Sequence, residues 1–98
     1  MNIQAMMKQA QKMQKDMMNS KKEIDEMTFT GSSSFVTIEM KGTKEIIKVS
    51  IDAESIEKDE IEMLEDMILV AVNEASKKVD EETENKLGKY TKGMPGLF

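Results

Sequence analysis

Apolar residues recur at heptad spacing along residues 2–27, a stretch that contains neither Gly nor Pro. One series, repeating every seven residues, is Ile3, Ala10, Met17 and Ile24. A second series, offset by three residues, is Met6, Met13, Ser20 and Met27. This a and d pattern predicts one long amphipathic helix. At 1.5 Å per residue it would be roughly 39 Å long, so we expect part of it to project or to pair with another chain.

The pattern then changes to a period of two, which is typical of strands. We expect a first strand at Met27–Thr30, ending at Gly31, and a turn at residues 32–34. Residues 35–41 and 45–51 alternate between apolar and polar, with Gly42 in the hairpin between them. The expected inward-facing side chains are Val36, Ile38, Met40, Ile47, Val49 and Ile51. The alternation predicts a three-stranded antiparallel meander with one covered face.

A helical pattern returns from about Glu60 to Leu87. Asp59 is the expected N-cap, with Glu62 completing a capping box. The apolar stripe is Ile61, Leu64, Ile68, Ala71, Val72, Ala75 and Val79. The polar run at residues 80–86 is expected to extend into solvent, and Gly88 suits the position after a helix end. These elements predict a single α+β domain over residues 1–87 and a flexible C-terminal tail over residues 88–98.

The amino-acid composition excludes several classes of function. The 98 residues include no Cys and no His, which excludes the usual nucleophile–base pairs and most zinc sites. We therefore expect no enzyme activity, no cofactor, no metal and no small-molecule substrate. No stretch approaches the run of about 18 apolar residues that crosses a bilayer. The first residues also lack the pattern of a secretory signal, so we expect a cytoplasmic protein with no membrane contact.

The charge of −5 is unevenly distributed. Residues 1–22 hold five Lys and one Asp, a net of +4, whereas residues 23–98 hold nine Lys and eighteen acidic residues, a net of −9. All basic residues are Lys, a point charge suited to phosphate, and none is Arg, the usual reader of guanine. Any contact with DNA is therefore expected to involve mainly the backbone. The candidate DNA-binding residues are Lys8, Lys12, Lys15, Lys21 and Lys22.

These lysines have a defined geometry on the predicted helix. With Ile3 at position a, three lysines occupy position f, opposite the apolar seam, namely Lys8, Lys15 and Lys22. Lys12 lies beside them at position c, and Lys21 lies at position e. Such a ridge can follow phosphates and release counterions. The alternative is a helix face that only keeps the protein soluble.

Two other features allow different interpretations. The acidic stretch from Asp52 to Glu62 suggests calcium, but Glu57 stands where an EF-hand loop requires Gly, so helix capping and solubility are favoured. Eleven of the residues are Met, and six of these lie within the first eighteen positions. A Met-rich surface can adapt to varied protein partners, so a protein–protein adaptor that uses this helix is the rival function. For Met6, Met13 and Met17 an apolar seam is the simpler explanation.

Several local segments, taken in order, resemble the YbaB/EbfC family of nucleoid-associated DNA-binding proteins. They are the run from Met6 to Gln14, Thr30-Gly31, Gly42, Val49–Asp52, Glu62–Asp66, Ala71–Ala75 and Gly93–Leu97. The resemblance implies a homodimer joined through its sheets, with helices projecting like the arms of tweezers. It also implies binding to double-stranded DNA in the nucleoid with little sequence preference, and neither catalysis nor a cofactor.

Overall fold

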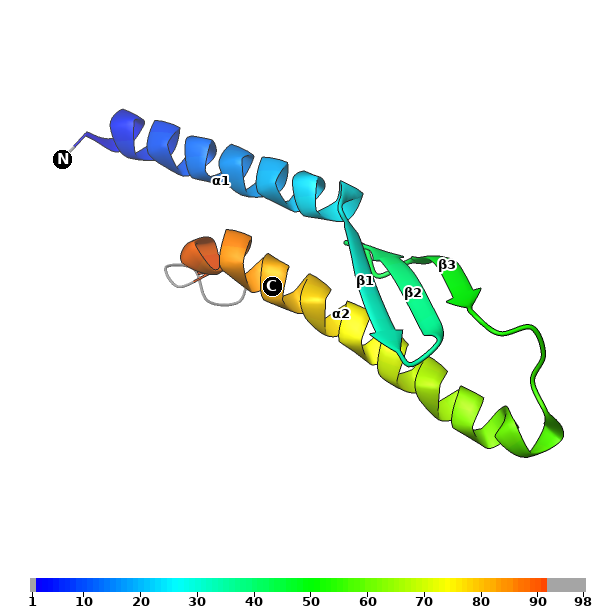
Figure 1. The fold of residues 1–98 in the computed structure, drawn as a ribbon. Helices are drawn as coiled ribbons and strands as arrows, with labels where there is room; N and C mark the ends of the chain where they lie inside the picture. The colour runs from blue at the N-terminus through cyan, green and yellow to red at the C-terminus, as the bar shows by residue number, and fades with distance from the viewer. Residues whose placement is uncertain (1, 92–98) are drawn as a thin grey trace.

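The computed structural model describes residues 2–91 (Figure 1). Along the chain it has α1 (Ile3–Glu26), β1 (Thr28–Ser33), β2 (Val36–Lys41), β3 (Ile46–Ile51), a single 3-10 turn η1 (Lys58–Glu60) and α2 (Ile61–Thr91). The three strands form one antiparallel sheet in the order β1-β2-β3. The predicted α+β class and the predicted order of elements are thus confirmed. The molecule is elongated, with principal extents of 71 × 21 × 14 Å.

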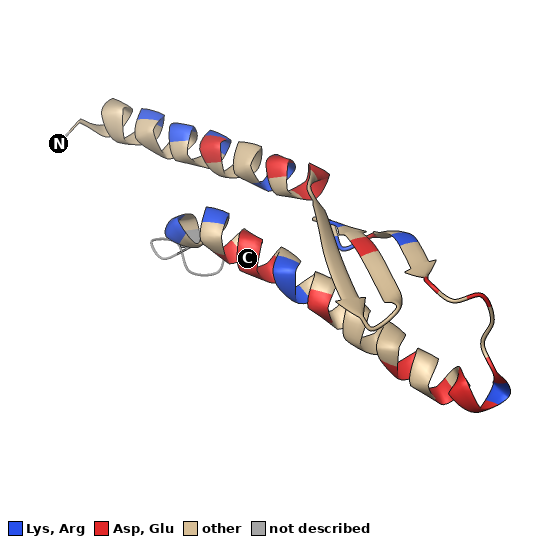
Figure 2. Ribbon diagram, viewed as in Figure 1, with Lys and Arg blue, Asp and Glu red and all other residues tan. Residues whose placement is uncertain are grey.

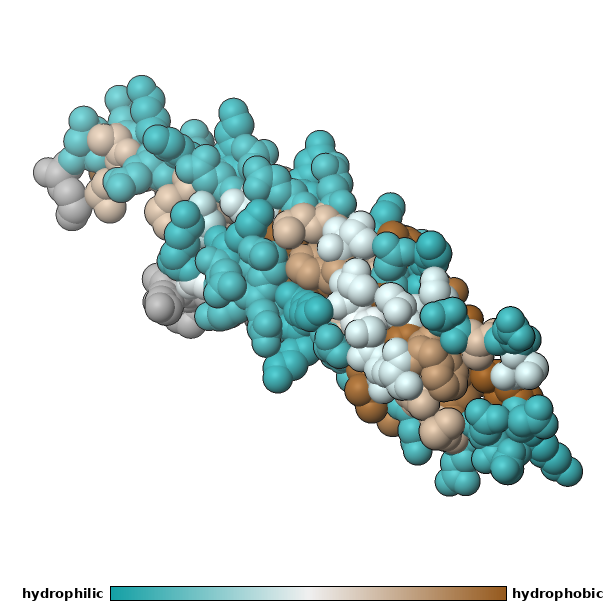
Figure 3. Space-filling view, in the orientation of Figure 1, coloured by the Kyte–Doolittle hydropathy of each residue, from teal (hydrophilic) through white to brown (hydrophobic). Residues whose placement is uncertain are grey.

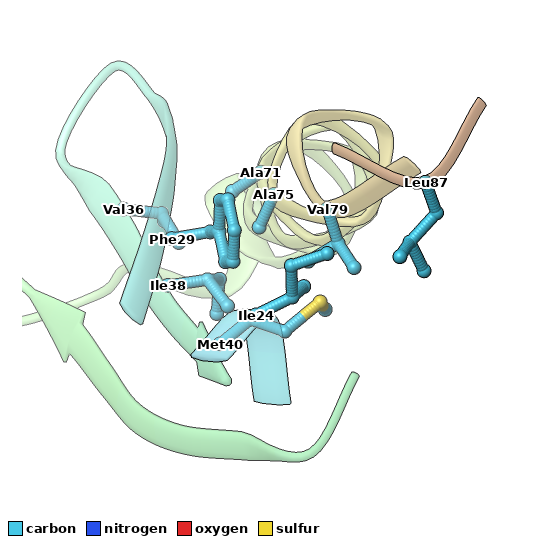
Figure 4. Close-up of a cluster of buried hydrophobic side chains, with 9 residues drawn as sticks. All are labelled: Ile24, Phe29, Val36, Ile38, Met40, Ala71, Ala75, Val79 and Leu87. Atoms are coloured by element: carbon cyan, nitrogen blue, oxygen red, sulfur yellow. The ribbon is translucent and has the colours of Figure 1, made fainter. Parts of the chain in front are cut away.

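The core lies between α2 and one face of the sheet (Figure 4). Val36, Ile38 and Met40 of β2 are buried, as their alternation predicts. From α2, Ala71, Ala75 and Val79 meet them. The remaining buried hydrophobic residues of the described structure are Ile24, Phe29 and Leu87. Because α2 packs on β1 and β2, these two strands provide the floor of the core.

Gly31 does not end the first strand, as predicted, but lies within β1 opposite Ile38. A Cβ at this position would overlap the Ala71 carbonyl oxygen and crowd the Ala75 backbone nitrogen. The glycine therefore lets α2 approach the strand backbone directly. The chain reverses at Ser34, whose φ is 52°, so the turn is shorter and lies later than predicted.

β3 has the predicted alternation but not the predicted burial. Val49 pairs with Ile38 and Ile51 pairs with Val36, so these side chains share the face that carries the core. Both are nevertheless exposed, because α2 does not extend over β3. A register shift near Glu39 and Met40 also places Ile46, rather than Ile47, opposite Met40.

Both ends of α2 differ from the prediction. Asp59 lies inside η1, and the helix proper begins at Ile61, so the expected N-cap position is wrong. At the other end α2 continues to Thr91, with Leu87 and Gly88 buried inside it. Within residues 80–86, Asp80, Glu81, Glu84 and Asn85 are exposed, as the sequence predicted, whereas Glu82, Thr83 and Lys86 are half-buried. Of the predicted flexible tail, residues 88–91 are helical, and residues 92–98 lie outside the described residues.

Candidate nucleic-acid interface

The N-terminal half of α1 projects beyond the body of the molecule (Figure 1). Asn2 caps the helix: its side-chain oxygen accepts a hydrogen bond from the Ala5 backbone N–H at 3.3 Å. Every residue from Asn2 to Asp16 is exposed, and Met17 is the first that packs against the core. Further along, Ile24 is buried and anchors the helix. The structure thus positions the first half of α1 as an arm held at one end.

All five candidate lysines of α1 are exposed, but they are not equivalent. Lys21 forms an ion pair with Asp25, with 3.4 Å between Nζ and Oδ2. Among residues 2–91 the structure gives Lys8, Lys12, Lys15 and Lys22 no ion-pair partner. Successive f positions lie about 10.5 Å apart along a helix axis, so the unpaired cations form a row. We call Lys8, Lys12, Lys15 and Lys22 the lysine ridge.

Charge separates along the molecule (Figure 2). Residues 2–15 contain three Lys and no acidic residue. The far end, from residue 52 to residue 66, contains eight acidic residues and one Lys. The two regions lie at opposite ends of an elongated chain (Figure 2), many times farther apart than the roughly 8 Å over which physiological salt screens charges. The acidic end therefore has little effect on the potential at the arm.

The lysines of α2 have other roles. Lys78 donates a hydrogen bond of 2.7 Å to the Thr30 carbonyl oxygen and pairs with Glu74 at 3.4 Å, which fixes α2 against β1. Lys86 pairs with Glu23 at 3.6 Å, linking α2 to α1. Lys77 lines a shallow hollow together with three acidic residues and one amide, namely Asp80, Glu81, Glu84 and Asn85. A phosphate would meet these carboxylates there, so this hollow is a poor anion site.

Tyr90 also has a structural position. It packs partly against the core, and the Lys89 ammonium group lies 5.1 Å from the centre of its ring. Tyr90 therefore does not lie in a flexible tail, although the sequence predicted one over residues 88–98. Lys92 and Phe98, two further tail residues, lie outside the described residues.

An apolar surface that the sequence did not single out borders the sheet. Val49 is 53% exposed and Leu69 of α2 is 60% exposed. Lys44, in the β2–β3 hairpin, pairs with Asp80 of α2 at 2.9 Å, which places the hairpin on the Asp80 side of the helix. Leu69 lies about three helical turns before Asp80 and hence on the same side. We call Ile46, Val49, Ile51 and Leu69 the β3 patch.

A sequence signal for the β3 patch existed but was incomplete. The alternation of β3 correctly assigned Val49 and Ile51 to the core face, but it cannot show that one helix is too narrow to cover three strands. Leu69 falls outside the stripe that packs on the sheet, and an exposed Leu on a helix is by itself unremarkable. Only the position of β3 at the edge of the sheet joins these residues into one surface.

The described residues offer no obvious site for other chemistry. Within residues 2–91, no three acidic side chains gather closely enough to hold a metal ion. The same part of the chain has no helix long and apolar enough to span a membrane. One shallow hollow within the described residues is lined by Ile3, Met6, Met7 and Ala10 of α1.

Comparison with known proteins agrees with this picture. A family model described as the YbaB/EbfC DNA-binding family matches residues 1–94. A nucleoid-associated protein of Oceanobacillus iheyensis is 48% identical over 101 residues, which cover 99% of this chain and 97% of the relative. One from Clostridium novyi is 45% identical, covering 100% of this chain and 90% of the relative. One from Lactococcus lactis is 45% identical, covering 97% and 98% respectively.

The fold also occurs among solved structures. The crystal structure of an uncharacterized protein from Helicobacter pylori superposes with a TM-score of 0.74. The match covers 92% of this chain and 97% of that one. Because the two sequences are only 20% identical, the match supports the arrangement of helices and strands alone.

Proposed function

The chain belongs to the YbaB/EbfC DNA-binding family, and we propose that it acts in the cytoplasm, on the nucleoid, as a homodimer that binds double-stranded DNA through the phosphate backbone. In this proposal sequence preference is weak, because Lys carries its charge without the planar fork that reads guanine. The protein has no catalytic step and needs no cofactor. Its effect is to alter the conformation of the DNA, with consequences for gene expression and for protection of the DNA.

The observation that carries the proposal is the lysine ridge on a projecting helix. Lys8, Lys12 and Lys15 are exposed, lack ion-pair partners in the described structure, and have no acidic residue between them. A row of free cations releases condensed counterions when it meets phosphates. A lysine that is already neutralised, such as Lys21 beside Asp25, contributes less. The ridge thus allows the arm to attract DNA phosphates, although the net charge of the whole chain is −5.

The β3 patch supports the homodimer. β3 is an edge strand, and its core face lacks the helix that covers β1 and β2. A second copy placed here would bury the exposed parts of four apolar side chains, which corresponds to roughly 3–6 kcal/mol at the usual value for burying such residues. It would also shield the edge of the sheet. Two copies carry two lysine ridges, so binding to one DNA molecule gains from multivalency.

The rival function is the protein–protein adaptor that uses the Met-rich first helix. One observation favours it: Met6, Met7 and Met13 are exposed on the arm. The two functions make different predictions for direct binding of this protein to DNA when no other protein is present. An adaptor with net negative charge should not bind DNA at any salt concentration, whereas a backbone-binding protein should bind strongly at low salt.

Fluorescence anisotropy with two duplexes of unrelated sequence tests the proposal. We expect the wild-type protein to bind both with similar affinity at low salt and to release both as salt is raised. Failure to bind either duplex at the lowest salt would reject DNA as the direct partner. Strong preference for one duplex would reject a mode dominated by the backbone.

A further inference from the structure

The free half of α1 has a second face that DNA binding does not use. Residues 2–16 are all exposed, so this part of the helix gains nothing from the core of its own chain. Isolated helices shorter than about 12–15 residues are marginal in water. Figure 3 shows apolar side chains along one side of this segment, among hydrophilic neighbours. A surface that covers this side would stabilise the arm.

That side is apolar at its centre and uncharged at its margins. The seam consists of the a and d residues Ile3, Met6, Ala10 and Met13, which continue the face that packs on the core further along α1. As far as Gln14, the flanking e and g residues are Asn2, Met7, Gln9 and Gln14. None of these eight carries a charge. The three lysines of this segment all lie at c and f, away from the seam.

The margins change where the arm joins the body. Asp16 and Glu23 occupy g positions, and Lys21 occupies an e position. Glu23 meets Lys86 of α2 there. Glu23 thus carries a flanking charge where α1 meets α2, whereas the e and g residues of positions 2–14 carry none and have no ion-pair partner within residues 2–91. This division points to a partner that presents the same residues as the arm itself.

We propose that the free half of α1 pairs with the free half of α1 from another homodimer, forming a short coiled-coil contact that links dimers. In a symmetric contact between identical helices, flanking charges of one sign can oppose one another, and uncharged flanks remove that repulsion. Ala10 lets the two backbones approach near the middle of the seam. The lysine ridge then points away from the contact and remains available to phosphate.

The contact should be weak in isolation. About three helical turns per chain bury less than the roughly 1,200 Å² found at the lower end of stable specific interfaces. It should therefore form at high local concentration, which binding along one DNA molecule would supply. Under the proposed DNA-binding function, the contact would let bound dimers connect neighbouring or distant DNA segments. The association itself does not depend on DNA, so it can be tested separately.

Sedimentation equilibrium without DNA provides the first test. As concentration rises from low micromolar to near millimolar, we expect the wild-type mass to increase beyond twice the 11.1 kDa chain mass. The variant Met6→Glu/Met13→Glu places like charges across the seam and should remain at twice the chain mass. The control Met18→Glu alters a methionine that is 62% exposed at position b and should behave as wild type. A wild-type mass that never exceeds twice the chain mass would overturn the proposal. The seam would then be covered by residues 92–98, by another protein or by solvent alone.

Cross-linking provides the second test. Because the chain has no Cys, Ala10→Cys introduces a single thiol on the seam and Gln11→Cys introduces a single thiol at position b, which faces away from the seam. A short bismaleimide should join two copies of Ala10→Cys several-fold more efficiently than two copies of Gln11→Cys. The product should persist when Val49→Glu disrupts the β3 patch. Equal yields from the two variants would contradict pairing through the seam, and loss of the product with Val49→Glu would place the contact inside the homodimer instead.

Discussion

Ile38 and Val49 face each other across β2 and β3 and point to the same side of the sheet, yet Ile38 is fully buried and Val49 is 53% exposed. The difference arises because α2 packs over β1 and β2 and leaves β3 uncovered. An apolar face that continues past its covering helix is a surface ready for a second copy. Ile46 and Ile51 of the same strand are also exposed, and so is Leu69 of α2.

The first prediction follows from this pair. Val49→Glu places a charge in the β3 patch and should weaken the homodimer by about a hundredfold or more, since burying an unpaired charge costs several kcal/mol and about 1.4 kcal/mol is a factor of ten. Sedimentation equilibrium at micromolar concentration should give twice the 11.1 kDa chain mass for wild type and a value near one chain mass for the variant. Circular dichroism should show that the variant remains folded. A wild-type monomer, or a Val49→Glu variant as dimeric as Met18→Glu, would contradict the role of the patch.

The second prediction concerns the close approach of Gly31 to α2. Gly31→Ala adds a Cβ where the Ala71 carbonyl oxygen already lies, so the helix must shift away from β1. Overpacking of this kind typically costs about 1–3 kcal/mol. Urea denaturation should show that loss in the free energy of unfolding. The neighbouring Ser32 is exposed on the opposite face, and Ser32→Ala should change stability little. Equal stability of the two variants would mean that α2 does not pack so closely.

The sequence predicted the helices and strands well because the hydrophobic periodicity of each is strong and depends only on residues close together in the chain. The heptad series through Ile24 predicted a helix over residues 2–27, and the structure has one at Ile3–Glu26. Alternation in residues 35–41 identified Val36, Ile38 and Met40 as the inward face, and all three are buried. The heptad positions of the lysines also described their exposure correctly.

The errors arose where a distant contact overrides a local signal. The Gly31-Ser32-Ser33 stretch has the composition of a turn, and only the small residues Ala71 and Ala75, far along the chain, explain a glycine inside a strand. Gly88 suits a helix end, but Leu87 and Tyr90 pack on the core and extend α2 past it. The candidate site shows the same limit: the sequence placed the lysines on the ridge, but it did not distinguish the paired Lys21 from the free Lys8.

The third prediction uses that distinction. Lys15→Gln removes a free cation from the lysine ridge and should reduce the slope of log affinity against log salt by about one unit. Lys21→Gln removes a cation already held 3.4 Å from Asp25, so its effect on the slope should be clearly smaller. Anisotropy titrations over a range of salt concentrations would measure both. Equal reductions would indicate that Asp25 does not neutralise Lys21 when DNA is present.

Replacing the three arm lysines together tests most directly whether α1 binds the DNA backbone. The variant Lys8→Glu/Lys12→Glu/Lys15→Glu turns attraction into repulsion, and its c and f positions leave the seam intact. The matched control Lys41→Glu/Lys58→Glu/Lys77→Glu changes the net charge equally at exposed lysines outside α1. In anisotropy titrations at low salt, with folding checked by circular dichroism, we expect the arm variant to lose nearly all binding to any duplex while the control keeps most of it. An arm variant that is folded and binds as tightly as the control would contradict the account.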